Sequence, residues 1–254
     1  MSTLLSLSGV HTHIGAYHIL HGVDFEVPAG QVTMLLGRNG AGKTTTLRTI
    51  MGLWSASAGR VLFDGRQIGG PAASGAKADS PRTPEIARLG IAYVPENMGI
   101  FADLTVRENM LLAAREARNA AELDTTRLEW LFALFPALRK FWLYPAGKLS
   151  GGQKQMLAIA RAMVEPRRLL LIDEPSKGLA PAIVQNLIAA LRELKSTATT
   201  VLLVEQNFAV AKALGDRVAV MYAGRVVHRG DMAALAEDDA LQHKLLGLSL
   251  ATHH

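Results

Sequence analysis

Residues 37–44 read GRNGAGKT and match G-x-x-x-x-G-K-[ST], the pattern of a loop whose backbone N–H groups wrap a phosphate chain. The preceding apolar run VTMLL, residues 32–36, predicts a buried strand, and Leu47, Ile50 and Met51 follow at helical spacing. A strand that feeds a glycine-rich loop at the start of a helix is the setting that such a loop requires. The sequence therefore predicts a nucleotide-phosphate site at a helix N-terminus.

Two more motifs follow this loop along the chain. LSGGQKQ spans residues 149–155, and LLLIDEP spans residues 169–175. Asp173 ends the apolar run, where a carboxylate is costly without a metal or a hydrogen-bond partner, so we predict that it holds Mg²⁺ through water. Glu174 comes next and, in an extended chain, points the other way, which suits a general base that polarises the attacking water. The alternative is a structural pair of carboxylates at a strand end.

The phosphate loop supplies the predicted ATP contacts. Lys43 is the cation that reaches the β- and γ-phosphates and stabilises the charge that builds as the γ-phosphoryl group departs. Thr44 faces Mg²⁺, and Thr45 lies beside it at the helix N-terminus. The backbone cradle is formed by Gly37, Arg38, Asn39, Gly40, Ala41 and Gly42.

Composition limits the remaining classes of function. The 254 residues hold one phosphate loop and one LSGGQ string, which indicates a single nucleotide-binding unit. The absence of cysteine excludes disulfides and thiolate catalysis, and the histidines show no ligand spacing. A net charge of +5, dispersed along the chain, does not indicate a nucleic-acid partner. We find no apolar run long enough for a membrane span and no signal-peptide pattern at the N-terminus, so we expect a cytosolic protein.

The order of the expected elements predicts an α/β fold with a P-loop NTPase (RecA-like) core. Short apolar clusters in residues 4–27 and 60–68 predict the hairpins of an antiparallel β subdomain, with a turn at Asp64-Gly65. Strands at 169–172 and 201–204 flank a helix at 183–194, which predicts a parallel sheet with helices on its faces. From Arg217 the chain reads as closing strands that turn at Gly224.

The remaining segments predict a helical insertion and a tail. Apolar residues at helical spacing predict helices at 104–121 and 128–135 and after Ser150, where the buried stripe consists of Met156, Leu157, Ala160, Met163 and Val164. Residues 69–84 predict a flexible surface loop, which we interpret as an insertion. We divide the single unit 1–254 into an ATP-binding core with its β subdomain (about 1–95 and 166–235), a helical subdomain (about 97–165), and a C-terminal helix and tail (236–254).

With its three ordered motifs, the chain resembles the ATP-binding subunits of ABC transporters from about Leu4 to about Gly230. Two departures from the broad pattern narrow the resemblance: YVPEN has Glu96 where Gln is usual, and LLVEQN has Gln206 where His is usual. Together with DLTVREN and EPSKGLAP, these segments are similar to the ATPases of branched-chain amino-acid importers. A third departure places Ile14 where an aromatic side chain usually stacks on adenine, with Tyr17 three residues further on.

This resemblance implies a dimer that sandwiches two ATP molecules. It implies that Ser150, Gly151, Gly152 and Gln153 contact the γ-phosphate held by the opposite subunit, although alone this string reads as a capped helix start. It further implies that Gln206 contacts the γ-phosphate and that Glu96 lies at the Mg²⁺ site. Lys177, in SKGLAP, is interpreted as a variable surface residue.

The implied partners are two membrane permease subunits, a sister ATPase subunit and, indirectly, an extracytoplasmic substrate-binding protein. The implied place is the cytoplasmic face of the inner membrane, where the subunit is peripheral. Two alternatives stay open at this point. One is a soluble ABC ATPase that is not coupled to transport, and the other is the ATPase of a urea or amide importer.

Overall fold

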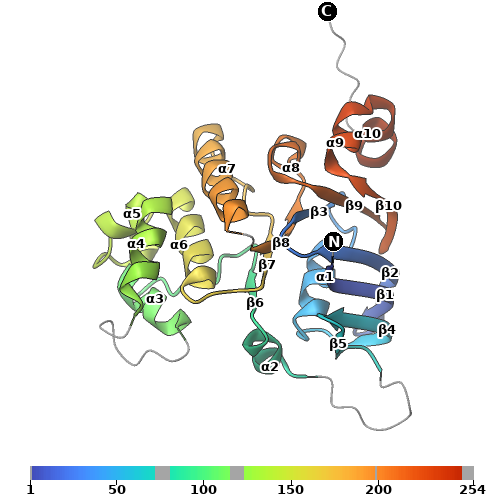
Figure 1. The fold of residues 1–254 in the computed structure, drawn as a ribbon, viewed down its shortest axis with the longest axis horizontal. Coiled ribbons are helices and arrows are strands. Elements are labelled where there is room, and N and C mark those ends of the chain that lie inside the picture. Colours follow the sequence, from blue (N-terminus) through green and yellow to red (C-terminus); the bar gives the residue numbers. More distant parts are fainter. Residues whose placement is uncertain (1, 72–80, 115–122, 198, 248–254) are drawn as a thin grey trace, which may run out of the picture.

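The computed structural model describes residues 2–71, 81–114, 123–197 and 199–247 and contains two sheets with helices around them (Figure 1). The strands are β1 (Thr3–Ile14), β2 (Tyr17–Pro28), β3 (Val32–Leu36), β4 (Ala56–Phe63), β5 (Arg66–Gly69), β6 (Ile91–Val94), β7 (Leu169–Asp173), β8 (Thr200–Glu205), β9 (Arg217–Tyr222) and β10 (Arg225–Asp231). The helices are α1 (Lys43–Ile50), α2 (Thr83–Arg88), α3 (Val106–Ala113), α4 (Thr125–Leu134), α5 (Pro136–Lys140), the 3-10 helix η2 (Ala146–Lys148), α6 (Gly151–Met163), α7 (Pro181–Ser196), α8 (Phe208–Leu214), α9 (Met232–Glu237) and α10 (Asp239–Leu246).

The larger sheet confirms the predicted parallel core. Its strand order is β10-β9-β3-β8-β7-β6, and every pair is parallel except β9 with β10. All residues of β3, β7 and β8 are buried, as expected for parallel strands that are covered on both faces. The carboxyl ends of these three strands therefore meet at one edge, which is where the phosphate loop begins.

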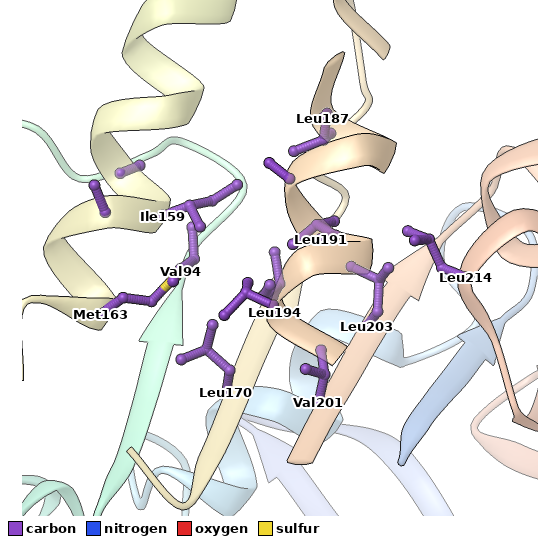
Figure 2. Packing of buried hydrophobic residues seen from close by; sticks show 14 of the residues in the cluster. Val94, Ile159, Met163, Leu170, Leu187, Leu191, Leu194, Val201, Leu203 and Leu214 are labelled. Atoms are coloured by element: carbon purple, nitrogen blue, oxygen red, sulfur yellow. The ribbon is translucent and has the colours of Figure 1, made fainter. Parts of the chain in front are cut away.

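Alternate residues of the central strands face two separate hydrophobic clusters, as the period of two in a strand requires. One cluster includes Leu170, Val201 and Leu203 and is covered by α6, α7 and α8. Figure 2 shows Leu187, Leu191 and Leu194 of α7 packed over these side chains. The other cluster lies against the smaller sheet and α1. The residues of the central strands that belong to it are Leu35, Leu169, Leu171, Leu202 and Val204.

The smaller sheet is antiparallel, in the order β2-β1-β4-β5, and confirms the predicted hairpins. Its turn at Asp64-Gly65 has both residues in the left-handed region, with φ of 51° and 75°. Gly224 forms the predicted turn between β9 and β10. Thr12 on β1 is fully buried, and its hydroxyl lies 3.1 Å from that of Thr49 on α1, so this sheet is joined directly to the helix that follows the phosphate loop.

Helices α3 to α6 gather on the side of the large sheet away from the smaller one (Figure 1). The predicted helix at 104–121 starts later, at α3, because Thr105 and Glu108 form a capping box; residues 115–122 lie outside the described part. The buried face of α6 is wider than the stripe of buried residues that the sequence predicts. Met156 is only half-buried, whereas Ala158 and Ile159 are buried as well, because α6 packs against both α3 and the sheet strand β6.

Two other segments differ in part from expectation. The predicted loop at 69–84 is regular at both ends, since Gly69 pairs with Val61 in the sheet and α2 begins at Thr83; residues 72–80 lie outside the described part. The expected C-terminal helix is two short helices, α9 and α10. The division into core, helical subdomain and tail stays a prediction. Across the described residues, no helix has the length and apolar character needed to cross a bilayer.

Candidate functional site

The loop between β3 and α1 is organised around the side chain of Lys43. Its ammonium group donates to the carbonyl oxygens of Gly37 at 2.8 Å and Arg38 at 3.1 Å, and it lies 3.2 Å from a carboxylate oxygen of Glu174. Lys43 is only 4% exposed, so this cation sits inside the loop with partners that compensate its burial. The ammonium group is therefore fixed next to the backbone that would surround a phosphate.

Two glycines allow the loop to close this tightly. A Cβ at Gly37 would lie 2.4 Å from the carbonyl oxygen of Met221, and one at Gly42 would lie 2.9 Å from a methyl group of Leu20. Gly42 is the N-cap of α1 with φ of 103°, and no side chain caps the first turn within the described residues. The backbone N–H groups at the start of α1 are thus left to a ligand, as in anion sites at helix N-termini. The intervening residues Asn39 and Gly40 are exposed.

Asp173, the last residue of β7, is fully buried and holds two hydroxyl groups. Thr44 donates to one carboxylate oxygen at 3.1 Å, and Tyr93 on β6 donates to the other at 3.3 Å. Burial raises the pKa of Asp173, while these two hydrogen bonds lower it and the carboxylates of Glu174 and Glu96 raise it again. Burial and Asp173 together raise the pKa of Tyr93 to about 12. Tyr93 was missed in the sequence, although it lies near the end of β6, which is parallel to β7 and so ends at the same edge of the sheet.

Glu174 does not continue the strand, contrary to the sequence prediction. Its φ of 48° is in the left-handed region, which is uncommon for a residue with a Cβ. Its N–H donates to the carbonyl of Val204 at 2.9 Å, which holds this bend against the neighbouring strand. The bend turns the carboxylate, 7% exposed, towards Lys43 rather than away from the sheet along an extended chain.

Gln206 faces Glu174 from the loop after β8. Its side-chain amide nitrogen lies 2.7 Å from both carboxylate oxygens of Glu174 and 2.7 Å from the side-chain oxygen of Asn39. One amide thus connects the predicted base with the exposed part of the phosphate loop. Three segments that are distant in the sequence, at Lys43, Glu174 and Gln206, converge on a single carboxylate.

Glu96 is paired with a residue that the sequence analysis treated as variable surface. The ammonium group of Lys177 donates to Glu96 at 2.5 Å and lies 3.6 Å from Glu174. Both Lys177 and Glu96 are about half exposed, and their hydrogen bond is the main cause that raises the pKa of Lys177. Lys177 thus lies at the surface, as interpreted from the sequence, and the bend at Glu174 also brings its ammonium group to the two carboxylates.

The oxygen donors around Asp173 fit the predicted Mg²⁺. A hydroxyl and a carboxylate already face each other at Thr44 and Asp173, and both are oxygen ligands of the kind that Mg²⁺ prefers. No group of three or more His, Cys, Asp or Glu side chains could hold a metal ion in the described part of the chain. The remaining ligands would then be waters and nucleotide phosphate oxygens, as is usual for this ion.

The other predicted contacts lie further from this centre. Ile14 is half-buried at the end of β1, paired with Tyr17 at the start of β2, and Tyr17 is 76% exposed. Ser150 caps α6: its hydroxyl accepts from the Gln153 N–H at 3.3 Å, and the Gln153 side chain accepts from the Ser150 N–H at 2.9 Å. Gly151 is exposed, and a Cβ at Gly152 would lie 2.4 Å from a methyl group of Ile183 on α7. Figure 1 shows α6 and α1 on opposite sides of β7. The LSGGQKQ segment at the start of α6, residues 149–155, which we call the signature string, is therefore apart from the phosphate loop within one chain.

Comparisons with known proteins identify relatives of this chain. The family model described as ABC transporter matches residues 20–177. The chain is 37% identical to the high-affinity branched-chain amino acid transport ATP-binding protein BraG of Pseudomonas aeruginosa, over 96% of this chain and 100% of that protein. It is 34% identical to the probable branched-chain amino acid transport ATP-binding protein LivF of Archaeoglobus fulgidus, over 91% and 93%.

Among solved structures, the chain is similar to cbiO1 from Clostridium perfringens, part of the ABC transporter complex cbiONQ, with a TM-score of 0.79 at 25% identity. That match covers 96% of this chain and 94% of the other. The phosphate loop, the paired carboxylates at the end of β7, the fold and the family match all lead to one assignment. This chain belongs to the ABC transporter family and is an ATPase of that family.

Proposed function

We propose that this chain is the ATPase subunit of a membrane importer for branched-chain or related amino acids, and that it hydrolyses ATP with Glu174 as the general base. The observation that carries the hydrolytic part is the Glu174 carboxylate, which is held between the ammonium group of Lys43 and the amide of Gln206. The importer class is supported by full-length similarity to BraG and LivF, whose names assign them to branched-chain amino-acid transport.

In this proposal the loop 37–45 binds the ATP phosphates. The uncapped first turn of α1 offers its N–H groups, and Lys43 exchanges its contact with Glu174 for phosphate oxygens. Thr44 and Asp173 would hold Mg²⁺, which, when bound, would offset phosphate charge. Glu96 would approach the metal only after it leaves Lys177, so the 2.5 Å ion pair represents a resting arrangement.

Hydrolysis needs a base that is oriented and shielded. Glu174 is almost fully buried and hydrogen-bonded, so its carboxylate is held in place, and it can accept a proton from a water placed beside the γ-phosphate. Gln206 has an uncharged amide that can donate to a phosphate oxygen and accept from that water. Its contact with Asn39 supports this role because it places the amide at the mouth of the loop.

A complete site in this proposal needs a second subunit. The signature residues of one chain, led by Ser150 at the start of α6, would meet the γ-phosphate on the loop of the other chain. The separation of α6 from α1 within the chain supports an arrangement in trans (Figure 1). The second subunit would be a copy or a sister ATPase. With the ATPase at the cytoplasmic face, two permease subunits in the membrane would receive the motion through the segment around Glu96, Met98 and Phe101. A substrate-binding protein outside would deliver the cargo to them.

Two variants test the arrangement in trans. Lys43→Ala should lose ATP binding, whereas Ser150→Arg should bind ATP as a monomer without hydrolysing it. A mixture of the two should regain activity, because one composite site then combines an intact loop with an intact signature. Ser150→Arg that dimerises with ATP and hydrolyses normally would show that the signature does not act across a dimer.

A purification tests the importer assignment. The tagged full-length chain, extracted from membranes in mild detergent, should retain two permeases and a sister ATPase, identified by mass spectrometry. Reconstituted with them in vesicles, it should support ATP-dependent uptake of leucine, isoleucine or valine. Uptake of urea or short amides instead would replace the substrate class but keep the importer.

A further inference from the structure

A second buried carboxylate lies next to the site and has no part in the proposed mechanism. Glu205 ends β8, the strand beside β7, and is 2% exposed. Its carboxylate accepts from the N–H of Ser176 at 3.1 Å and from the hydroxyl of Ser176 at 2.9 Å. It also accepts from the N–H groups of Gln206 at 3.2 Å and Asn207 at 3.3 Å. Four donors from two different loops therefore converge on one side chain.

These four hydrogen bonds hold the Glu205 carboxylate in place. Burial raises the pKa of Glu205, and the hydrogen bonds from Ser176, Asn207 and Gln206 lower it. A buried charge is costly without several donors, and without this acceptor the two donors of Ser176, itself a buried residue, would be left unpaired. The carboxylate thus has a structural requirement that neither an apolar residue nor an amide of the same size can meet.

The two loops that Glu205 joins are those that carry Glu174 and Gln206, the two side chains proposed to act in hydrolysis. Ser176 lies two residues after Glu174, whose backbone is bent into the left-handed region. Gln206 directly follows Glu205, and its amide lies 2.7 Å from both oxygens of Glu174. The same carboxylate therefore fixes both chain segments close to where their side chains meet.

We propose that Glu205 is a positioning residue for ATP hydrolysis. Its carboxylate joins the loop of Ser176 to the loop of Gln206, an arrangement that we call the clamp, and so fixes the positions of Glu174 and Gln206 relative to each other. This inference rests on the proposed roles of Glu174 and Gln206 and adds the residue that sets their geometry. Among the hydrogen bonds and ion pairs of the described residues, the Glu205 side chain makes none with the phosphate loop, so its replacement should affect turnover and leave ATP binding intact.

Two variants change the clamp to different degrees. Glu205→Gln keeps the shape of the side chain but presents an NH₂ group to N–H donors. We expect kcat to fall about ten- to a hundredfold, as for a misplaced reacting group, while KM for ATP stays within about threefold of the wild-type value. Ser176→Ala removes one of the four hydrogen bonds, and we expect kcat to fall about three- to tenfold. Asp216→Asn is the matched control, because this carboxylate accepts from the Val32 N–H and pairs with Lys195 at the other end of β3. Its kcat should stay within about twofold of the wild type.

A double variant separates positioning from general loss of structure. If Glu205 acts through Gln206, adding Glu205→Gln to Gln206→Ala should lower kcat by much less than it does in the wild type, because coupled residues are non-additive. Multiplicative effects, or wild-type kcat in both Glu205→Gln and Ser176→Ala, would overturn the inference. If Glu205→Gln does not fold in thermal unfolding, Ser176→Ala decides alone.

Parallel assays of Glu174→Gln and Gln206→Ala distinguish this failure from failure of the proposed function. If these two variants are impaired while the clamp variants are not, only the role of Glu205 is wrong. If Glu174→Gln and Gln206→Ala both turn over ATP at the wild-type rate, the hydrolytic roles and the clamp fall together.

Discussion

Replacing Glu174 by Gln should separate ATP binding from ATP hydrolysis. The carboxylate is 7% exposed, lies 3.2 Å from the Lys43 ammonium group and accepts from Gln206 on both oxygens. The amide keeps the volume but loses the charge and one acceptor, and its NH₂ group would face the amide nitrogen of Gln206. Loss of a general base lowers kcat by about 10²- to 10⁴-fold. At about 1.4 kcal/mol per tenfold, the barrier should rise by about 3–5 kcal/mol.

The same substitution should strengthen ATP binding. Lys43 must leave Glu174 to contact phosphate, and a charge-assisted hydrogen bond is worth about 1.5–3 kcal/mol. Because the carbonyls of Gly37 and Arg38 still hold Lys43, we expect only the lower end of this range, about a tenfold gain in affinity. Equilibrium nucleotide binding and steady-state ATPase rates measure both effects. Hydrolysis within threefold of the wild type would refute the role of Glu174 as the base, and an ATP affinity that does not rise would refute the predicted release of Lys43.

Three further predictions concern the phosphate loop, the contact with the adenine ring of ATP, and the dependence of stability on pH. Gly37→Ala should lower the free energy of unfolding by about 1–3 kcal/mol and abolish nucleotide binding, because its Cβ would lie 2.4 Å from the Met221 carbonyl oxygen; thermal unfolding and ATP titration check this. With Ile14 in place of an aromatic, the wild type should discriminate weakly between ATP and GTP, and Ile14→Tyr should tighten ATP binding by about 1–3 kcal/mol in competition assays unless Tyr17 already stacks on the base. Burial, and after it the neighbouring imidazole of His18, lowers the pKa of His21 below 6.5. The folded state therefore binds a proton at His21 less readily than the unfolded chain does, and the protein loses stability as the pH falls below that value. His18→Gln should therefore reduce the fall in Tm between about pH 7.5 and pH 5.5, and an unchanged fall would exclude this source of acid sensitivity.

The phosphate loop and the strand ends were predictable because their signals are local. A wholly buried strand in a parallel sheet must be continuously apolar, so VTMLL and LLLID identify β3 and β7. A carboxylate at the end of such a run is costly without a partner, which singled out Asp173. The same rule applied to TVLLVE would have found Glu205, which the sequence analysis left without a role.

The bend at Glu174 was not predictable, and it changed more than one residue. Glutamate has no preference for a left-handed backbone, so nothing in the letters LLLIDEP signals φ of 48°. The bend is stabilised by a hydrogen bond to Val204, a residue thirty positions away that belongs to another strand. Because the chain turns there, Lys177 comes back to Glu174 and pairs with Glu96, 81 residues earlier in the chain. This one backbone bend therefore brings the ammonium group of Lys177 to the carboxylates of Glu96 and Glu174, although Lys177 stays about half exposed.

The signature string presents the opposite difficulty, because its local structure is predictable and says nothing about its function. Ser150 and Gln153 form a capping box, which satisfies the start of α6 within a single chain. A capped helix start has the same geometry and nearly the same energy whether or not a phosphate of another subunit approaches it. Gly151 is exposed, and a Cβ at this position would have no neighbour within 4 Å, so packing within the described part of the chain does not explain a glycine there. A small residue there is expected if another surface must come close to the backbone, and this supports the proposed dimer together with the separation of α6 from α1.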